Sequence, residues 1–263
     1  MTTMMKKLLL ALLVSIAAGC AMGPPIDYSY NAVSQDSRAQ YLIIHFTWGD
    51  WNSSLKELTV GPVSAHYLVR DDPVEIYSLV DENRRAYQAG ASSWKGQTML
   101  NAASIGIEIV NAGNRLAKEG VPWQPYPPEQ VEAVVKLVKW IVARHEIRPD
   151  RILGHSDIAP QRKIDPGPLF PWKRLADEGL IIWPDAKRVA ERLPDYEKNL
   201  PDIDWFQAKL AKHGFEVPRN GEYDEATVRV IAAFQMKYRP SRCDGTPDAE
   251  TAALLDALNA APS

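Results

Sequence analysis

The stretch GHSDIAPQRKIDPGPLFPW, residues 154–172, holds a histidine, a lysine and an aspartate in one loop that prolines stiffen. Each proline fixes φ, and Pro166 also disfavours a helical conformation at Asp165, the residue before it. Because side chains alternate in an extended segment, we expect Lys163 and Asp165 to point to the same side. His155 and Asp165 offer an imidazole and a carboxylate, which are ligand types that suit zinc. The loop predicts part of a metal site and leaves a third ligand and a base to be found.

Five short apolar runs predict the strands of a sheet, and the loop follows the last of them. They are YLIIHF (41–46), AHYLVR (65–70), EIYSLV (75–80), SIGIEIV (104–110) and ILGH (152–155). The second and third runs are separated by Asp-Asp-Pro, a turn signal, and predict a hairpin. In the fourth run isoleucines alternate with Gly106 and Glu108, so Glu108 projects from the face opposite the isoleucines.

A strong amphipathic helix is predicted between the last two strands. The segment EQVEAVVKLVKWIVARH (129–145) follows Pro128 and places valines and an isoleucine on one stripe. Strands mixed with helices, including a hairpin, are typical of an α/β domain. We predict a mixed central sheet flanked by helices over residues 36–185.

The character of the chain changes after residue 185. Residues 186–200 are charged and contain proline, which predicts a linker with some helical content. Within residues 201–260, three helical segments are joined by loops that carry Gly and Asp signals. We predict a small all-α three-helix bundle with a modest core.

The N-terminal segment is predicted to be a targeting signal. Two lysines precede an unbroken apolar stretch, residues 8–18, that is too short to span a membrane but suits a signal peptide. Small residues before Cys20 resemble the bacterial lipobox, so we predict a signal peptide over 1–19, a lipidated Cys20 and a tether over 20–35. Ala21 is not the aspartate that retains lipoproteins in the inner membrane, which favours an outer-membrane lipoprotein facing the periplasm of a Gram-negative bacterium. The alternative is an ordinary signal peptide with an incidental cysteine.

Charge and cysteine content exclude other classes of protein. The formal net charge is −3 and no basic run occurs, which argues against a partner nucleic acid. The chain has two cysteines, Cys20 and Cys243, so it has no disulfide framework.

A catalytic zinc needs three protein ligands and leaves one position for water. His45 ends the first predicted strand, where the chain leaves the sheet, and makes the best trio with His155 and Asp165. Asp157 is a competing ligand, although we expect it to cap the turn that follows it. His66 as a fourth ligand would close the water position, so we expect it to pack or to support a ligand.

Four segments, in chain order, resemble the zinc-dependent N-acetylmuramoyl-L-alanine amidases of the amidase type 2 family over roughly residues 35–185. They are YLIIHFT, VSAHYLV, SIGIEIVN and GHSDIAPQRKIDPGPLFPW. The resemblance implies one Zn²⁺ ion with a bound water as fourth ligand and three protein ligands, His45, His155 and Asp165. It also implies Glu108 as the general base and Lys163 as the second catalytic group. Because Lys163 stands beside Asp165 in the loop, we expect it to donate to the oxyanion of the tetrahedral intermediate.

The chain departs from this family at Tyr87-Gln88, where close relatives usually read Trp-His before Ala-Gly. Any contribution of that histidine to substrate binding or to ligand orientation is therefore in doubt here. The positions that the resemblance makes ligands or catalytic groups are intact.

The C-terminal helices resemble the peptidoglycan-binding domain type 1 through FQAKLAKHGF, GEYDEATVRVIAAFQ and DGTPDAETAALL. The two resemblances together imply hydrolysis of the amide bond between N-acetylmuramic acid, or its anhydro form, and L-alanine of the peptidoglycan stem peptide. The sequence leaves open which sugar form is preferred. Two alternatives are a non-catalytic peptidoglycan receptor and a zinc peptidase that cuts within the stem peptide. We expect a monomer whose partners are peptidoglycan, muropeptide fragments and, through Cys20, a membrane.

Overall fold

The computed structural model describes residues 23–117 and 122–260. The predicted signal peptide and Cys20 lie outside these residues. The chain divides into two units, and the described part of the first, residues 23–36, contains no helix or strand. The second unit begins at Ser37 and holds all the elements below. None of the described helices has the length and apolar character that crossing a membrane requires.

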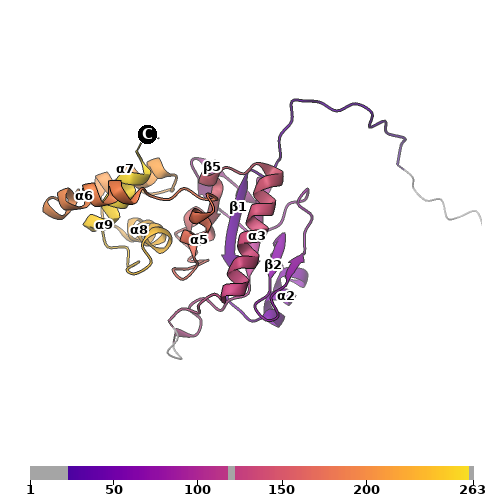
Figure 1. The fold of residues 1–263 in the computed structure, drawn as a ribbon, viewed down its shortest axis with the longest axis horizontal. Coiled ribbons are helices and arrows are strands. Elements are labelled where there is room, and N and C mark those ends of the chain that lie inside the picture. The colour runs from indigo at the N-terminus through magenta and orange to yellow at the C-terminus, as the bar shows by residue number, and fades with distance from the viewer. Residues whose placement is uncertain (1–22, 118–121, 261–263) are drawn as a thin grey trace, which may run out of the picture. The chain divides into compact units, whose positions relative to one another are not determined.

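A mixed sheet forms the centre of the second unit (Figure 1). It has five strands in the order β3-β2-β6-β1-β7. The strands β2, β6, β1 and β7 run parallel, and β3 pairs antiparallel with β2 as the predicted hairpin. Their bounds are β1 Tyr41–Phe46, β2 Tyr67–Val69, β3 Ile76–Ser78, β6 Ser104–Ile109 and β7 Ile152–Gly154. The predicted mixed sheet is confirmed, and a short hairpin that the sequence did not predict, β4 Ser93–Trp94 with β5 Gln97–Thr98, lies beside it.

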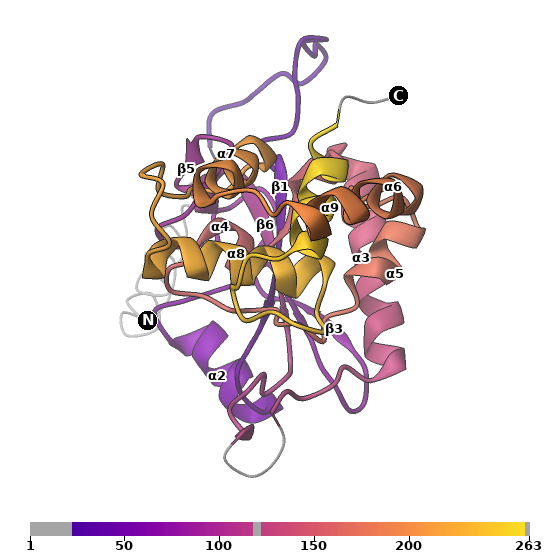
Figure 2. The ribbon, with the colours of Figure 1, turned by 90° about the vertical axis from the view of Figure 1, so that its left-hand side faces the viewer.

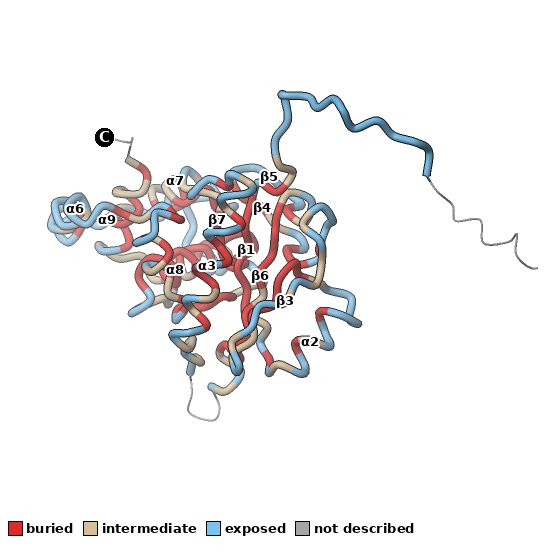
Figure 3. The backbone as a smooth tube through the Cα atoms, turned by 45° about the vertical axis from the view of Figure 1, so that its right-hand side comes forward, coloured by how far each residue is buried: buried red, intermediate tan, exposed pale blue. Residues whose placement is uncertain are grey.

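One face of the sheet packs against α3, Pro128–His145, the amphipathic helix predicted from its valine stripe. The alternate residues of β1 and β6 on this face, among them Ile44 and Ile107, contact Val138 and Ile141 in one apolar cluster. β1 is buried along its length and β6 at every residue but Glu108, as expected for parallel strands covered on both faces (Figure 3). The remaining elements of this part are α2 Trp51–Val60, α4 His155–Ile158, α5 Trp172–Asp177 and the 3₁₀ turns Leu100–Ala102 and Pro149–Arg151.

The C-terminal helices cover the opposite face of the sheet (Figure 2). The three predicted helices are α7 Ile203–His213, α8 Glu225–Tyr238 and α9 Ala249–Leu258, and each begins at an aspartate that caps its first turn. Their core is continuous with that of the sheet, because Ile43 and Leu153 belong to the same apolar cluster as Phe206 and Phe234. The sequence predicted the helices but not this shared core.

The region that the sequence predicts as a linker is mostly one helix, α6 Ala186–Lys198, which starts at the capping residue Asp185 and packs against α9. Its Arg192 and the α7 residue Lys209 both pair with Asp256 on α9. The connection between the two predicted domains is therefore an ordered part of the helical layer. The residue boundaries of those domains stay a prediction.

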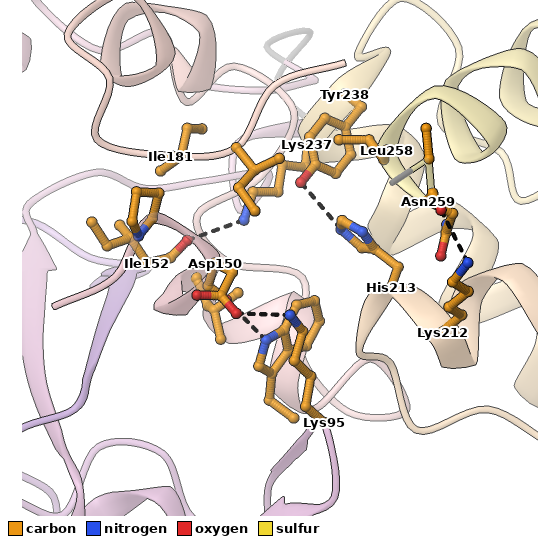
Figure 4. Close-up of a pocket in the computed structure, with 15 residues that line it drawn as sticks. Lys95, Asp150, Ile152, Ile181, Lys212, His213, Lys237, Tyr238, Leu258 and Asn259 are labelled. Atoms are coloured by element: carbon orange, nitrogen blue, oxygen red, sulfur yellow. Dashed lines mark hydrogen bonds and ion pairs between the residues drawn. The ribbon is translucent and has the colours of Figure 1, made fainter. Parts of the chain in front are cut away.

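The contact between the sheet and the helices is partly polar (Figure 4). The ammonium group of Lys237, on α8, donates to Asp157 Oδ2 at 2.7 Å and to the carbonyl oxygen of Ile152 at 3.2 Å. It also lies 4.2 Å from the ring centroid of Trp172. A small hollow beside it is lined by His213, whose Nε2 lies 3.2 Å from the hydroxyl of Tyr238.

Candidate metal centre

Strand register explains why three distant residues meet. In the parallel pair β1–β6, His45 lies opposite Glu108, and in β1–β7, Ile44 lies opposite Gly154. His155 follows Gly154 directly, so it reaches the same level of the sheet as His45. The carboxyl ends of parallel strands meet at one edge, and that edge is where sites form in such sheets.

The donor atoms of His45, His155 and Asp165 converge, although the residues lie up to 120 positions apart. His45 Nδ1 lies 2.9 Å from Asp165 Oδ2 and 3.0 Å from His155 Nδ1. His155 Nδ1 lies 3.1 Å from the same carboxylate oxygen. All three residues are buried, and they form the one group among the described residues whose donor atoms are placed to hold a metal ion.

The loop that supplies Asp165 is held against the helix that supplies His155. The amide of Ser156 donates to the carbonyl oxygen of Asp165 at 2.8 Å, which closes the loop of residues 155–165. Lys163 and Asp165 line the same pocket, in agreement with the prediction that their side chains point to the same side. The two residues are thus fixed relative to the ligand histidine.

The competing candidates have other partners. Asp157 Oδ2 accepts from the amide of Gly154 at 2.8 Å and from Lys237. The expectation that Asp157 caps the turn after it was wrong, because α4 begins at His155 and makes Asp157 the third helical residue, which bonds backward. His66 accepts from the Gly106 amide through Nδ1 and meets a backbone carbonyl through Nε2, so it is not a ligand.

The protonation states in the metal-free protein suit a cation. Burial lowers the pKa of His155 to about 4, so its imidazole is neutral at neutral pH. Burial opposes ionisation of Asp165, but the two histidines outweigh it and hold the pKa of this carboxyl well below its ordinary value. Burial likewise opposes protonation of His45, yet the charges on Glu108 and Asp165 raise the pKa of that ring.

Glu108 and Lys163 line the pocket that also contains these donors. Glu108 Oε2 is buried and has no hydrogen-bond partner among the described residues. Burial raises the pKa of Glu108 to about 7; Asp165 adds to the rise, whereas His45 and Lys163 oppose it. A buried carboxylate with a free oxygen and a pKa near neutrality has the properties of a general base.

The sequence did not identify the groups behind the two histidines. His45 Nε2 lies 2.6 Å from Gln88 Oε1, and His155 Nε2 lies 3.2 Å from the carbonyl oxygen of Ala89. The sequence marked Gln88 only as a departure from a family pattern. No periodicity or spacing in a single chain connects residue 88 with residues 45 and 155.

Comparison with known proteins agrees with the arrangement of His45, His155 and Asp165. A family model described as N-acetylmuramoyl-L-alanine amidase matches residues 35–168. The chain is 41% identical over 258 residues to the N-acetylmuramoyl-L-alanine amidase AmiD of Escherichia coli (strain K12), covering 92% of this chain and 93% of that protein. The chain belongs to the N-acetylmuramoyl-L-alanine amidase family. A family model of a peptidoglycan binding domain matches residues 199–255 of this chain.

Two solved structures have the fold of this amidase. The complex of Escherichia coli AmiD with the substrate anhydro-N-acetylmuramic acid-L-Ala-D-γ-Glu-L-Lys has a TM-score of 0.77 and 40% identity, and covers 90% of this chain and 94% of that one. The complex of Pseudomonas aeruginosa AmpDh3 with an anhydromuramic pentapeptide has a TM-score of 0.82 and 36% identity, and covers 90% and 98%. Both cover the sheet and the C-terminal helices, which confirms the predicted fold.

Proposed function

We propose that this amidase hydrolyses the amide bond between N-acetylmuramic acid, or its 1,6-anhydro form, and L-alanine of the stem peptide. The convergence of His45, His155 and Asp165 beneath a pocket that also holds Glu108 and Lys163 carries the proposal. The complexes of AmiD and AmpDh3 with anhydromuramic peptides support the substrate class. The anhydro form is therefore the first substrate to test.

Zinc is the metal that we propose for the site. Two imidazoles and one carboxylate form a donor set of the kind that catalytic zinc sites use, and three ligands leave a position open. The neutral imidazole of His155 and the ionised Asp165 match the forms in which these residues bind metals. Bound there, zinc supplies a nucleophilic water near neutral pH and polarises the scissile carbonyl.

Glu108 is the general base in this proposal. It faces the ligand His45 from the next strand, and its unpartnered Oε2 is placed to accept the proton of the attacking water. The same carboxyl then delivers that proton to the nitrogen of L-alanine, which must leave as an amine. Burial keeps the carboxyl near the pKa at which it both accepts and donates at neutral pH.

Lys163 stabilises the charge that develops on the carbonyl oxygen. It lines the pocket two residues before the ligand Asp165, so the loop fixes its position relative to the metal. A cation aimed at a developing oxyanion acts more strongly in the transition state than on the neutral amide, which raises kcat.

Digestion of purified peptidoglycan and of anhydro-muropeptides, with and without a chelator, tests the function. We expect mass spectrometry to show free stem peptides that begin with L-alanine, and we expect chelation to abolish them. Products cut within the stem peptide would identify a peptidase instead. Binding without cleavage by the zinc-loaded protein would identify a receptor.

The attachment of the enzyme is also a proposal. A lipid on Cys20 would anchor it in the outer membrane, facing the periplasm, while residues 199–255 bind the wall and raise the local substrate concentration. Incorporation of labelled palmitate that disappears in Cys20→Ser tests the lipid. Incorporation that persists in that variant, or none in the wild type, would favour an ordinary signal peptide.

A further inference from the structure

Two consecutive residues contact the far side of both histidines of the candidate metal centre. The Nδ1 atoms of His45 and His155 face Asp165, so the Nε2 atoms point away from the site. His45 Nε2 meets the side-chain oxygen of Gln88, and His155 Nε2 meets the main-chain oxygen of Ala89. One short segment thus touches both rings at the atoms that a metal does not use.

The hydrogen bonds around Gln88 fix which way its amide points. The hydroxyl of Ser104 donates to the carbonyl oxygen of Leu100 at 2.6 Å, so its oxygen is available as an acceptor. Gln88 Nε2 donates to that oxygen at 2.7 Å. The other end of the amide, Oε1, must then face His45 and can only accept, so His45 Nε2 carries a hydrogen. In the neutral ring, which is the form that binds a metal, Nδ1 is therefore the nitrogen with the lone pair.

The backbone of this segment is itself held in place. Asn101 Oδ1 accepts from the amide of Gln88 at 3.0 Å and from the amide of Ala89 at 2.7 Å. Gly106, on β6, leaves room for the glutamine, because a Cβ there would lie 2.5 Å from Gln88 Cγ. Gln88 is buried, so water does not compete for its amide.

We propose that Gln88 is a positioning residue for the metal: held by Ser104 and Asn101, it fixes the tautomer and the ring orientation of His45, while Ala89 does the same for His155. This inference rests on the proposed metal site. A ligand imidazole usually donates its second nitrogen to an oxygen, and that bond fixes the tautomer and raises ligand basicity. Gln88 supplies this oxygen where close relatives usually carry a histidine.

Metal affinity of Gln88→Met tests the proposal, because methionine keeps the volume and removes both hydrogen bonds. The dissociation constant for Zn²⁺ is measured on the full chain by competition with a chromophoric chelator. We expect about 10- to 100-fold weaker binding. The Co²⁺-loaded variant should also show an altered visible absorption spectrum, since the ring of His45 is no longer held.

A matched control separates positioning from a general loss of structure. Gln130 on α3 is also buried and donates to the carbonyl oxygens of Val110 and Val69, but it does not contact the candidate metal ligands. We expect Gln130→Met to lower the thermal unfolding temperature of the metal-free protein and to leave the Zn²⁺ dissociation constant unchanged. Gln88→His should bind Zn²⁺ nearly as tightly as the wild type does, because one nitrogen of a neutral imidazole can accept the hydrogen bond from His45.

The outcomes distinguish this inference from the proposed function. Equal Zn²⁺ affinity and equal Co²⁺ spectra in the wild type and Gln88→Met would overturn the positioning role while leaving the metal site intact. Equal loss of affinity in Gln88→Met and Gln130→Met would also overturn it, because the effect would then follow from stability alone. A wild-type protein that binds neither ion would instead overturn the proposed metal site.

Discussion

Asp157, in α4, and Asp165, in the loop that follows this helix, are two buried carboxylates whose surroundings differ in kind. Asp157 is 1% exposed and meets the ammonium group of Lys237 at 2.7 Å and the amide of Gly154 at 2.8 Å. Asp165 is 6% exposed and shares one oxygen between the Nδ1 atoms of two histidines. The first carboxylate has an ammonium group of the chain as its partner, whereas the second lies between two imidazole nitrogens, which are groups that can also bind a metal.

This difference separates a structural buried charge from a functional one. Removing a charge from water is costly, and the cost is offset only by a nearby opposite charge with good hydrogen bonds. Lys237 offsets it for Asp157 through a direct ion pair, so that pair needs no other ligand. The imidazoles around Asp165 have lone pairs that converge with the carboxylate, an arrangement that a divalent cation stabilises better than a proton does.

The largest expected effect, on zinc content and hydrolysis, comes from removing the charge of Asp165, whereas removing that of Asp157 should have little effect on either. We expect Asp165→Asn to lose bound zinc and all measurable hydrolysis, because an amide replaces the ionised ligand. Asp157→Asn should retain zinc and turnover in the fraction that folds. Elemental analysis of purified protein and release of stem peptides from anhydro-muropeptides measure the two effects. Wild-type zinc content in Asp165→Asn would remove that residue from the ligand set, and His155→Ala provides the parallel loss of both properties.

Glu108→Ala should separate binding from chemistry. We expect it to keep its zinc and to lose about 10²- to 10⁴-fold in kcat, the usual contribution of a general base. Its carboxyl is next to the ligand His45 but is not one of the converging donors. Zinc content and single-turnover rates of the same preparation provide the comparison. Turnover near that of the wild type would transfer the role of base to another group.

Local patterns in the sequence predicted most of the fold. The apolar run of β1, the alternation of β6 and the stripe of α3 are each visible within a few residues, because burial and helical or strand periodicity act locally. The aspartates that cap α7, α8 and α9 are equally local signals. The predicted trio of His45, His155 and Asp165 does come together in the structure.

The relations that depend on tertiary packing were not predictable from one chain. The register that puts Glu108 beside His45 follows from strand order, and the family resemblance, not the spacing, suggested this pair. Lys237 lies in an amphipathic helix, where a lysine is expected at the surface, yet it is buried against Asp157. Gln88 has no local signal at all, since its partner His45 is 43 residues away.

Lys237→Met should lower the free energy of unfolding strongly and change metal binding little. Breaking a buried ion pair leaves Asp157 with an uncompensated charge, which costs about 3–5 kcal/mol in the free energy of unfolding. The exposed pair Lys173–Asp177 is the control, because Lys173→Met should cost less than about 1 kcal/mol. Urea unfolding of the wild type, Lys237→Met, Asp157→Asn and their double variant measures the coupling, with Lys173→Met unfolded alongside as the control. If the double variant were no more stable than Lys237→Met alone, the cost would lie in packing around Trp172 and not in the charge of Asp157.

The smallest expected effect concerns His213, whose protonation affects stability and which is not a candidate metal ligand. Burial, with lesser contributions from Lys237 and Lys95, lowers the pKa of His213 from 6.5 to about 3, so the folded protein holds this ring neutral. The unfolded chain takes up a proton below pH 6.5 and the folded chain does not, so stability from this group is present above pH 6.5 and is lost as the pH falls toward 3.

The ring of His213 is packed between Trp94 and Phe234 but is not fully buried, so the expected loss is about 1 kcal/mol per pH unit, somewhat below the limit for one proton. His213→Phe removes the titrating group. The difference in free energy of unfolding between this variant and the wild type, both metal-free, should therefore shift in favour of the variant between pH 7.5 and pH 5. Parallel pH profiles of the variant and the wild type would mean that the ring also takes up a proton in the folded state. The hollow between the sheet and the helices would then contain a charge that Tyr238 alone cannot satisfy. The charges of Asp157 and Lys237, in contrast, pair with each other.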